Sequence, residues 1–252
     1  MSTIPVALQL YTVRSETAKD FIGTLREVAR MGYVGVEFAG TGDLSAAELR
    51  AVLDDLNLAR AGSHIGIDPL EKELARVIEF NLEIGNPYIV CPGVPEARRS
   101  SADEYRALAA SFNTIGAECK KHGLTFAYHN HHVEFQTFDG QYGLDILYEA
   151  SDPALVKAEV DTYWVQYAGE DPATYIRRYP GRCPLIHLKD MADDADRSFA
   201  EVGEGIMDFD EIFAACEIGG VQWYIVEQDT CKRPSLESAR LSLENLKAKG
   251  MA

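Results

Sequence analysis

The first predicted strand, residues 5–10, runs into Gln9-Leu10-Tyr11-Thr12-Val13-Arg14. An open, doubly wound α/β sheet usually carries a glycine-rich phosphate-binding turn after its first strand. This segment contains no glycine. The sequence therefore favours an α/β sheet that closes on itself over an open one.

The rest of the chain repeats one unit, a short apolar or β-branched run followed by a helical pattern. Phe21, Leu25 and Val28, for example, share one helix face at i, i+4 and i+7. The predicted strands are residues 5–10, 35–38, 59–64, 88–91, 125–129, 156–161, 185–188 and 223–227. The predicted helices include residues 21–31, 46–56, 70–84, 102–121 and 236–247, with N-caps at Asp20, Ser45 and Ser101. Alternating strands and helices form a parallel sheet, and eight units in roughly 250 residues predict one closed (β/α)8 barrel.

Composition narrows the class of protein and its partners. We expect residues 1–252 to form a single domain. A formal net charge of −16 argues against nucleic acid as a partner, because phosphate backbones require a basic surface. No apolar run reaches the roughly 18 residues of a membrane span, and the N-terminus lacks the features of a signal peptide. The five cysteines form no CxxC pair, so we expect free thiols and a cytoplasmic location.

Ligand-type side chains recur where the predicted strands end. The active site of a closed α/β barrel lies at the C-terminal ends of its strands. Polar groups end the second, third, fifth, sixth, seventh and eighth strands, whereas the fourth ends in Cys91-Pro92-Gly93. They are Glu37, His64, His129, His131, Asp161, His187 and Glu227, with Glu134 just beyond the fifth strand. This convergence predicts a site on one rim of the barrel.

These residue types suit one divalent metal ion. Carboxylates with an imidazole bind hard or borderline ions, so we expect Mn²⁺, with Mg²⁺, Co²⁺ or Zn²⁺ as alternatives. Such an ion acidifies the C–H beside a carbonyl by stabilising the enediolate. Two carboxylates on opposite sides of that carbon could remove and return its proton, and Glu134 and Glu227 are the candidates.

Each candidate also has a structural alternative. Asp161 could be a helix N-cap, His187 a buried hydrogen-bonded histidine, and Glu134 a surface residue of its loop. Glu227 is the least ambiguous, because a carboxylate that closes the apolar run Tyr224-Ile225-Val226 needs a partner.

Several of these residues lie in longer characteristic segments. The segments are Leu8-Gln9-Leu10-Tyr11-Thr12-Val13-Arg14, Gly35-Val36-Glu37-Phe38, Tyr128-His129-Asn130-His131-His132-Val133-Glu134-Phe135, Val160-Asp161-Thr162, His187-Leu188-Lys189-Asp190 and Val202-Gly203-Glu204-Gly205-Ile206-Met207-Asp208-Phe209. Their order and spacing resemble the xylose isomerase-like TIM-barrel superfamily, specifically its sugar phosphate isomerase/epimerase group. The resemblance spans nearly the whole chain.

The resemblance implies one metal ion held by Glu, Asp, His and Glu from four strand ends. Asp161, His187 and Glu227 match the last three ligands. The place of the first holds His129 in this chain, and the nearest carboxylate is Glu134, so either could be the first ligand; we expect Glu134. The remaining polar groups are expected to contact substrate, namely Glu37, His64, His129, His131 and Lys189.

The resemblance implies an enzyme that isomerises or epimerises a small sugar, keto sugar or sugar phosphate. A lyase or dehydratase acting on a sugar acid, keto-glycoside or inositol derivative is the first alternative, because it begins with the same proton abstraction. A non-catalytic sugar-binding barrel is the second, and the displaced first Glu is its one indication. The superfamily's DNA-repair branch needs a basic face, which the charge of −16 argues against. The expected partner is a small carbohydrate, with no nucleic acid or membrane, and a homo-oligomer is open.

Overall fold

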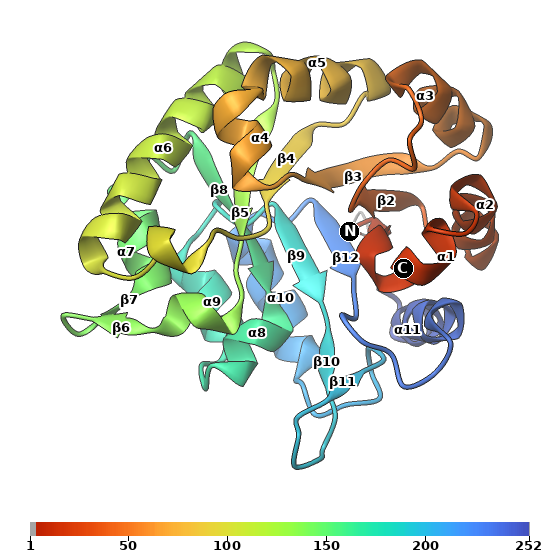
Figure 1. The fold of residues 1–252 in the computed structure, drawn as a ribbon. Coiled ribbons are helices and arrows are strands. Elements are labelled where there is room, and N and C mark those ends of the chain that lie inside the picture. The colour runs from red at the N-terminus through yellow and green to blue at the C-terminus, as the bar shows by residue number, and fades with distance from the viewer. Residues whose placement is uncertain (1–3, 252) are drawn as a thin grey trace.

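The computed structural model describes residues 4–251 and contains a closed barrel of eight parallel strands (Figure 1). Around the barrel the order is β1-β12-β9-β8-β5-β4-β3-β2. The strands are β1 (Val6–Gln9), β2 (Gly35–Phe38), β3 (Ala59–His64), β4 (Tyr88–Cys91), β5 (Thr125–His129), β8 (Val156–Asp161), β9 (Leu185–Leu188) and β12 (Trp223–Val226). The predicted (β/α)8 fold is confirmed, and only the first and last strands are shorter than predicted.

Helices surround the barrel on its outside (Figure 1). They are α1 (Arg14–Thr17), α2 (Phe21–Met31), α3 (Ala46–Asp55), α4 (Ile67–Lys72), α5 (Leu74–Ile84), α6 (Ala102–Lys121), α7 (Gly143–Ala150), α8 (Thr162–Tyr167), α9 (Pro172–Arg178), α10 (Phe209–Gly219) and α11 (Ser235–Ala248). The predicted N-caps Asp20, Ser45 and Ser101 each accept a hydrogen bond from a backbone N–H in the first turn. None of the helices in the described part of the chain combines the length and hydropathy that a bilayer span requires.

One predicted helix is in fact two. The prediction of a single helix over residues 70–84 is wrong, because α4 begins at Ile67 and the helical path breaks at Glu73. The backbone of Glu73 leaves the helical region at φ −134° and ψ 27°. Pro69 lies in the first turn of α4, where its missing N–H costs no intrahelical hydrogen bond.

The barrel interior is layered, and the layering places the polar residues. Successive strand side chains point to opposite faces, so residues two apart share a face. An apolar layer formed by Ala7, Ala61, Val90, Ala127, Leu185 and Ile225 fills the barrel interior. Two positions further along four of these segments lie Gln9, His129, His187 and Glu227. Ser63 holds the same position after Ala61 and accepts a hydrogen bond from Asn86. These polar side chains therefore lie one step nearer the C-terminal rim.

A buried carboxylate organises the loop that follows β9. Asp190 lies in β10 (Asp190–Met191), which pairs with β11 (Phe199–Ala200), and it accepts hydrogen bonds from the backbone N–H groups of Gly203, Gly205 and Met207 at 2.9, 2.9 and 3.2 Å. A Cβ at Gly205 would lie 2.3 Å from Asp190 Oδ1, so only glycine fits there. The turn at residues 203–207 is thus held by the side chain of Asp190.

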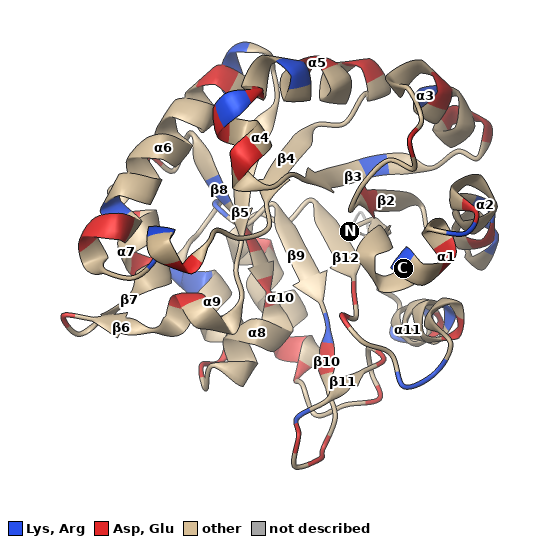
Figure 2. Cartoon of the chain, viewed as in Figure 1, with Lys and Arg blue, Asp and Glu red and all other residues tan. Residues whose placement is uncertain are grey.

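Charged residues of both signs are interspersed over the outer helices (Figure 2). Many form ion pairs within one helix, such as Lys72 with Asp68 at 2.8 Å and Arg106 with Asp103 at 2.8 Å. Solvent-exposed pairs of this kind contribute roughly 0–1 kcal/mol each. The carboxylates inside the barrel are in a different environment.

Candidate metal and substrate site

Four buried side chains converge at the C-terminal rim. His129, Asp161, His187 and Glu227 each offer one potential ligand atom, and these atoms lie within 4.8 Å of one another. They come from β5, β8 and β9 and from the residue directly after β12. The structure therefore brings together three residues that the sequence assigned to the metal, and adds His129 to them.

Glu134 lies outside this group. It sits in a 3-10 helix, η3 (His132–Phe135), and its side chain is only 1% exposed. One carboxylate oxygen accepts a hydrogen bond from Tyr128 Oη at 2.9 Å, and the other accepts one from the backbone N–H of His131 at 2.7 Å. Glu134 thus caps the helix in which it lies instead of folding back to the expected ion. Its burial also excludes the surface-loop alternative.

Two further carboxylates, Glu159 and Glu37, contact the imidazoles deeper in the barrel. Glu159 Oε2 lies 2.7 Å from His64 Nε2 and 3.0 Å from His129 Nδ1. Glu37 Oε2 lies 2.7 Å from His187 Nε2, and Gln9 Nε2 donates to the same carboxylate at 2.8 Å. Carboxylates that bond the second nitrogen of a histidine fix the orientation of its ring, a common feature of metal sites.

These contacts account for the protonation of His64 and of Glu37, whereas burial and the neighbouring His187 hold the pKa of His129 well below its usual value despite its contact with Glu159. Burial lowers the pKa of His64, but the carboxylates of Glu37 and Glu159 outweigh it and raise the pKa to about 10. Burial raises the pKa of Glu37, but His64 and His187 hold it well below its usual value. His131 has no such carboxylate beside it, and burial together with Lys189 lowers its pKa to about 3. His131 is therefore a neutral imidazole near neutral pH.

Lys189 is a buried cation shared by three carboxylates. Its Nζ lies 2.9 Å from Asp161 Oδ2, 2.7 Å from Glu227 Oε2 and 2.7 Å from Asp229 Oδ1. Burial alone would lower the pKa of Lys189, but Asp161, Glu227 and Asp229 hold it well above the usual value. Lys189, which we expect to contact substrate, is thus held in this structure by three carboxylates of the rim.

The carboxylates around Lys189 differ among themselves. Burial raises the pKa of Asp161 to about 6, although Lys189 opposes the shift. Burial would also raise the pKa of Glu227, but Lys189 and His187 hold it well below its usual value. For Asp229, burial outweighs Lys189 and the pKa is raised. Asp161 also accepts a hydrogen bond from Trp164 N at 2.9 Å, so it is the N-cap of α8 as well as a rim residue.

The rim opens into a cavity of about 460 Å³, within the range of small-molecule sites. Its wall contains four of the five expected substrate contacts, together with Glu227 and the half-buried Asp229. The four are His64, His129, His131 and Lys189, and Tyr11, Ala39 and Pro92 complete the wall. Glu37 lies below, against His187, and does not line this cavity.

The donor set and the charge balance both fit a metal ion. Two imidazoles and two carboxylates suit a borderline divalent cation. Four fully buried carboxylates meet in this part of the barrel, namely Glu37, Glu159, Asp161 and Glu227. Lys189 is the single ammonium among them, and buried charge needs compensation. The balance must come from protons on the imidazoles or from a bound cation.

Sequence reasoning missed Glu159 and Asp229. Glu159 lies two residues before Asp161 in the same strand and so shares its inward face, a signal that the period-two pattern offered. Asp229 lies in the loop after β12, where that pattern does not apply.

The sequence is similar to a known family of barrels and to bacterial enzymes. The family model of the xylose isomerase-like TIM barrel matches residues 25–249. An inosose dehydratase of Geobacillus kaustophilus is 28% identical over 244 residues, which cover 81% of this chain and 79% of that enzyme. An inosose dehydratase of Clostridium beijerinckii is 25% identical and covers 83% of this chain and 82% of its own length.

Solved structures share the fold at lower identity. A sugar phosphate isomerase/epimerase of Parabacteroides distasonis matches with a TM-score of 0.86 at 24% identity, covering 100% of this chain and 96% of that one. A D-allulose 3-epimerase of Methylomonas sp. matches with a TM-score of 0.73 at 14% identity, covering 99% of each chain. By the extent of the family match, the chain belongs to the xylose isomerase-like TIM-barrel family.

Proposed function

We propose that this protein is a divalent-metal-dependent lyase that removes water from a small polyhydroxylated ketone, such as an inosose or a keto sugar. The observation that carries the proposal is the arrangement of Glu227 and Asp229, two carboxylates that contact the same ammonium and line the same cavity. Removal of water needs one group that accepts a proton from carbon and one that delivers a proton to the departing hydroxyl.

The ligands of the ion would be His129, Asp161, His187 and Glu227, with Mn²⁺ as the expected metal. When bound, the ion supplies Lewis-acid polarisation of the substrate carbonyl and its neighbouring hydroxyl. Glu159 and Glu37 orient the imidazoles of this set. This assignment takes His129 as the first ligand because Glu134 is committed to capping η3.

The chain's own residues then carry the proton transfers. Glu227 accepts the proton from the carbon beside the carbonyl. Lys189 donates a hydrogen bond to the oxygen on which negative charge develops, in a site where burial strengthens that interaction. Asp229 delivers a proton to the departing hydroxyl, and His64 and His131 contact the remaining hydroxyls from the cavity wall.

The position of Glu134 favours this lyase over the isomerase that the sequence placed first. Proton return to the opposite face was assigned to Glu134 and Glu227, but Glu134 is bonded to Tyr128 and His131 and does not line this cavity. The inosose dehydratase relatives support the same preference. An isomerase or epimerase stays the second candidate, because His131 lines the cavity three strands away from Glu227 and is a neutral proton acceptor.

The test incubates Mn²⁺-loaded protein with a panel of inososes, keto sugars and keto-glycosides in deuterated water. Loss of water or of an alcohol supports the lyase, whereas deuterium incorporation without elimination supports the isomerase. Glu227→Gln should abolish either reaction and leave the fold intact. Glu204→Gln is the matched control, because its carboxylate pairs with Arg233 outside the cavity. Full activity of Glu227→Gln would refute its role, and a protein that binds no metal would favour a non-catalytic sugar-binding barrel.

A further inference from the structure

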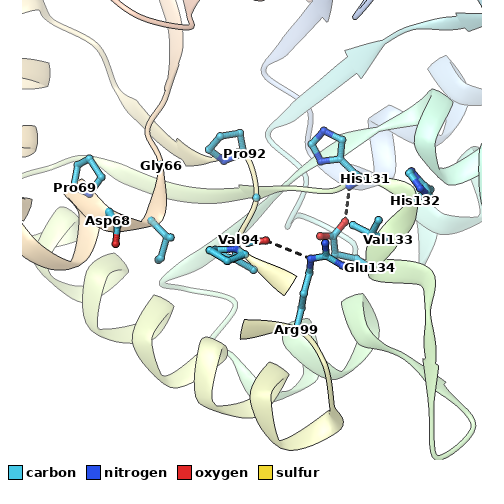
Figure 3. Close-up of a pocket in the computed structure, with 13 residues that line it drawn as sticks. Gly66, Asp68, Pro69, Pro92, Val94, Arg99, His131, His132, Val133 and Glu134 are labelled. Atoms are coloured by element: carbon cyan, nitrogen blue, oxygen red, sulfur yellow. Dashed lines mark hydrogen bonds between the residues drawn. The ribbon is translucent and has the colours of Figure 1, made fainter. Parts of the chain in front are cut away.

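A second cavity of about 550 Å³ lies beside the proposed substrate cavity (Figure 3). It is formed by segments that follow β3, β4 and β5, and it shares Pro92 and His131 with the wall of the first cavity. Ile67, Val94 and Val133 give it apolar surface. Because Pro92 and His131 belong to both walls, the two cavities are neighbours at the same rim of the barrel.

Arg99 contributes a guanidinium to the wall of this cavity. Its Nε donates to the backbone carbonyl of Val94 at 3.3 Å, and the structure shows no ion pair between Arg99 and any described carboxylate (Figure 3). The neighbouring Arg98 differs, because it donates to both oxygens of Glu71 at 2.9 and 3.1 Å. The two terminal nitrogens of Arg99 are therefore free to bind a ligand.

The acidic residues of the cavity wall are already engaged. Asp68 pairs with Lys72 at 2.8 Å. Both oxygens of Glu134 accept hydrogen bonds, from Tyr128 and from the backbone of His131, although Glu134 lies close to Arg99 in the close-up (Figure 3). In a chain with a formal net charge of −16, an unpaired guanidinium marks a place where an anion is favoured locally.

We infer that this cavity binds an anionic substituent, a phosphate or a carboxylate, of the carbohydrate whose reacting carbons occupy the first cavity. The inference rests on the proposed function and, within its substrate class, favours polyhydroxylated ketones that carry an anionic substituent over the uncharged inososes. Arg99 would bind two oxygens of the anion with its forked N–H groups, a geometry that suits both phosphate and carboxylate.

The test measures binding of three polyols to the Mn²⁺-loaded protein by calorimetric titration at fixed salt. D-glucitol is neutral, D-gluconate carries a carboxylate and D-glucitol 6-phosphate carries a phosphate; none has an aldehyde or ketone, so none is turned over. We expect at least one anionic polyol to bind tenfold or more tightly than D-glucitol, and the better anion identifies the substituent. Equal or absent binding of the three probes overturns the inference.

Variants show whether Arg99 is responsible. Arg99→Met should remove the preference for the anion and leave the affinity for D-glucitol unchanged, while Arg99→Lys should keep part of it. Arg106→Met removes the same charge from an ion pair with Asp103 outside the cavity, and should change nothing. A preference that survives Arg99→Met would place the anion elsewhere, for instance on the metal ion, and would overturn the inference.

The same samples separate this inference from the proposed function. A protein that binds Mn²⁺ but shows no preference among the polyols refutes the anion cavity and leaves the metal-dependent lyase standing. A protein that binds no Mn²⁺ refutes the metal-dependent reaction, and the polyol comparison then decides the anion cavity with metal-free protein.

Discussion

Removing the ammonium of Lys189 tests how charge is balanced inside the barrel. Lys189 is 1% exposed, and its Nζ contacts Asp161, Glu227 and Asp229 within 2.9 Å. Loss of one partner from a buried ion pair costs about 3–5 kcal/mol, because the other charge is left uncompensated. For a chain of this size about 1 kcal/mol shifts the melting temperature by roughly 2–4 °C. Lys189→Met should therefore melt about 6–20 °C lower than the wild type when metal is chelated with EDTA.

Adding Mn²⁺ should reverse much of this loss. A ligand that binds only the folded state stabilises it by about 2.7 kcal/mol at a hundredfold excess over its dissociation constant. In the wild type the ion must share Asp161 and Glu227 with the ammonium, whereas in Lys189→Met it does not. The rise in melting temperature on adding Mn²⁺ should thus be larger in the variant.

Differential scanning calorimetry with EDTA or with Mn²⁺ measures both effects. Lys232→Met is the matched control, because Lys232 forms one exposed pair with Asp194 at 2.9 Å. It should lose no more than about 1 kcal/mol. If Lys189→Met and Lys232→Met have the same melting temperature in EDTA, Lys189 is not the counter-charge of the site and the electrostatic account is wrong.

Two further outcomes test the fold around the site. Gly205→Ala should lower the free energy of unfolding in urea by about 1–3 kcal/mol, because its Cβ would lie 2.3 Å from Asp190 Oδ1. Gly66→Ala, whose Cβ would meet no atom within 4 Å, should stay near the wild type. Equal stability of the two variants would contradict the role of Asp190. Of the five thiols, Cys231 should react fastest with Ellman's reagent at pH 8, because it is the one that is not buried. Burial raises its pKa as well, but raises the pKa of Cys91 to about 12. A second thiol that reacts as fast would contradict the packing.

The sequence predicted the barrel well because its strands are short apolar runs separated by helices. Asp161, His187 and Glu227 could be placed at one rim from the sequence because each ends a predicted strand, and the active site of a closed α/β barrel lies at those ends. The position of Glu134 could not be predicted in this way. It depends on local hydrogen bonds of η3, a turn without periodicity, where the carboxylate caps the helix that contains it.

The remaining differences have other physical causes. Glu159 escaped attention because only the last residue of each predicted strand was considered, although the inward face extends further down. The sequence does not indicate which of the neighbouring residues Arg98 and Arg99 forms an ion pair. In the structure Arg98 donates to both oxygens of Glu71 in α4, and Arg99 forms no ion pair with a described carboxylate. Such pairings are decided by three-dimensional proximity alone.

Lys189 and Asp190 are consecutive residues with separate tasks. The first side chain enters the barrel and meets the rim carboxylates, while the second leaves it and holds the turn at residues 203–207. Consecutive residues of an extended backbone point to opposite faces. One short segment after β9 therefore serves both the ion pairs inside the barrel and the hydrogen bonds that hold the turn at its border.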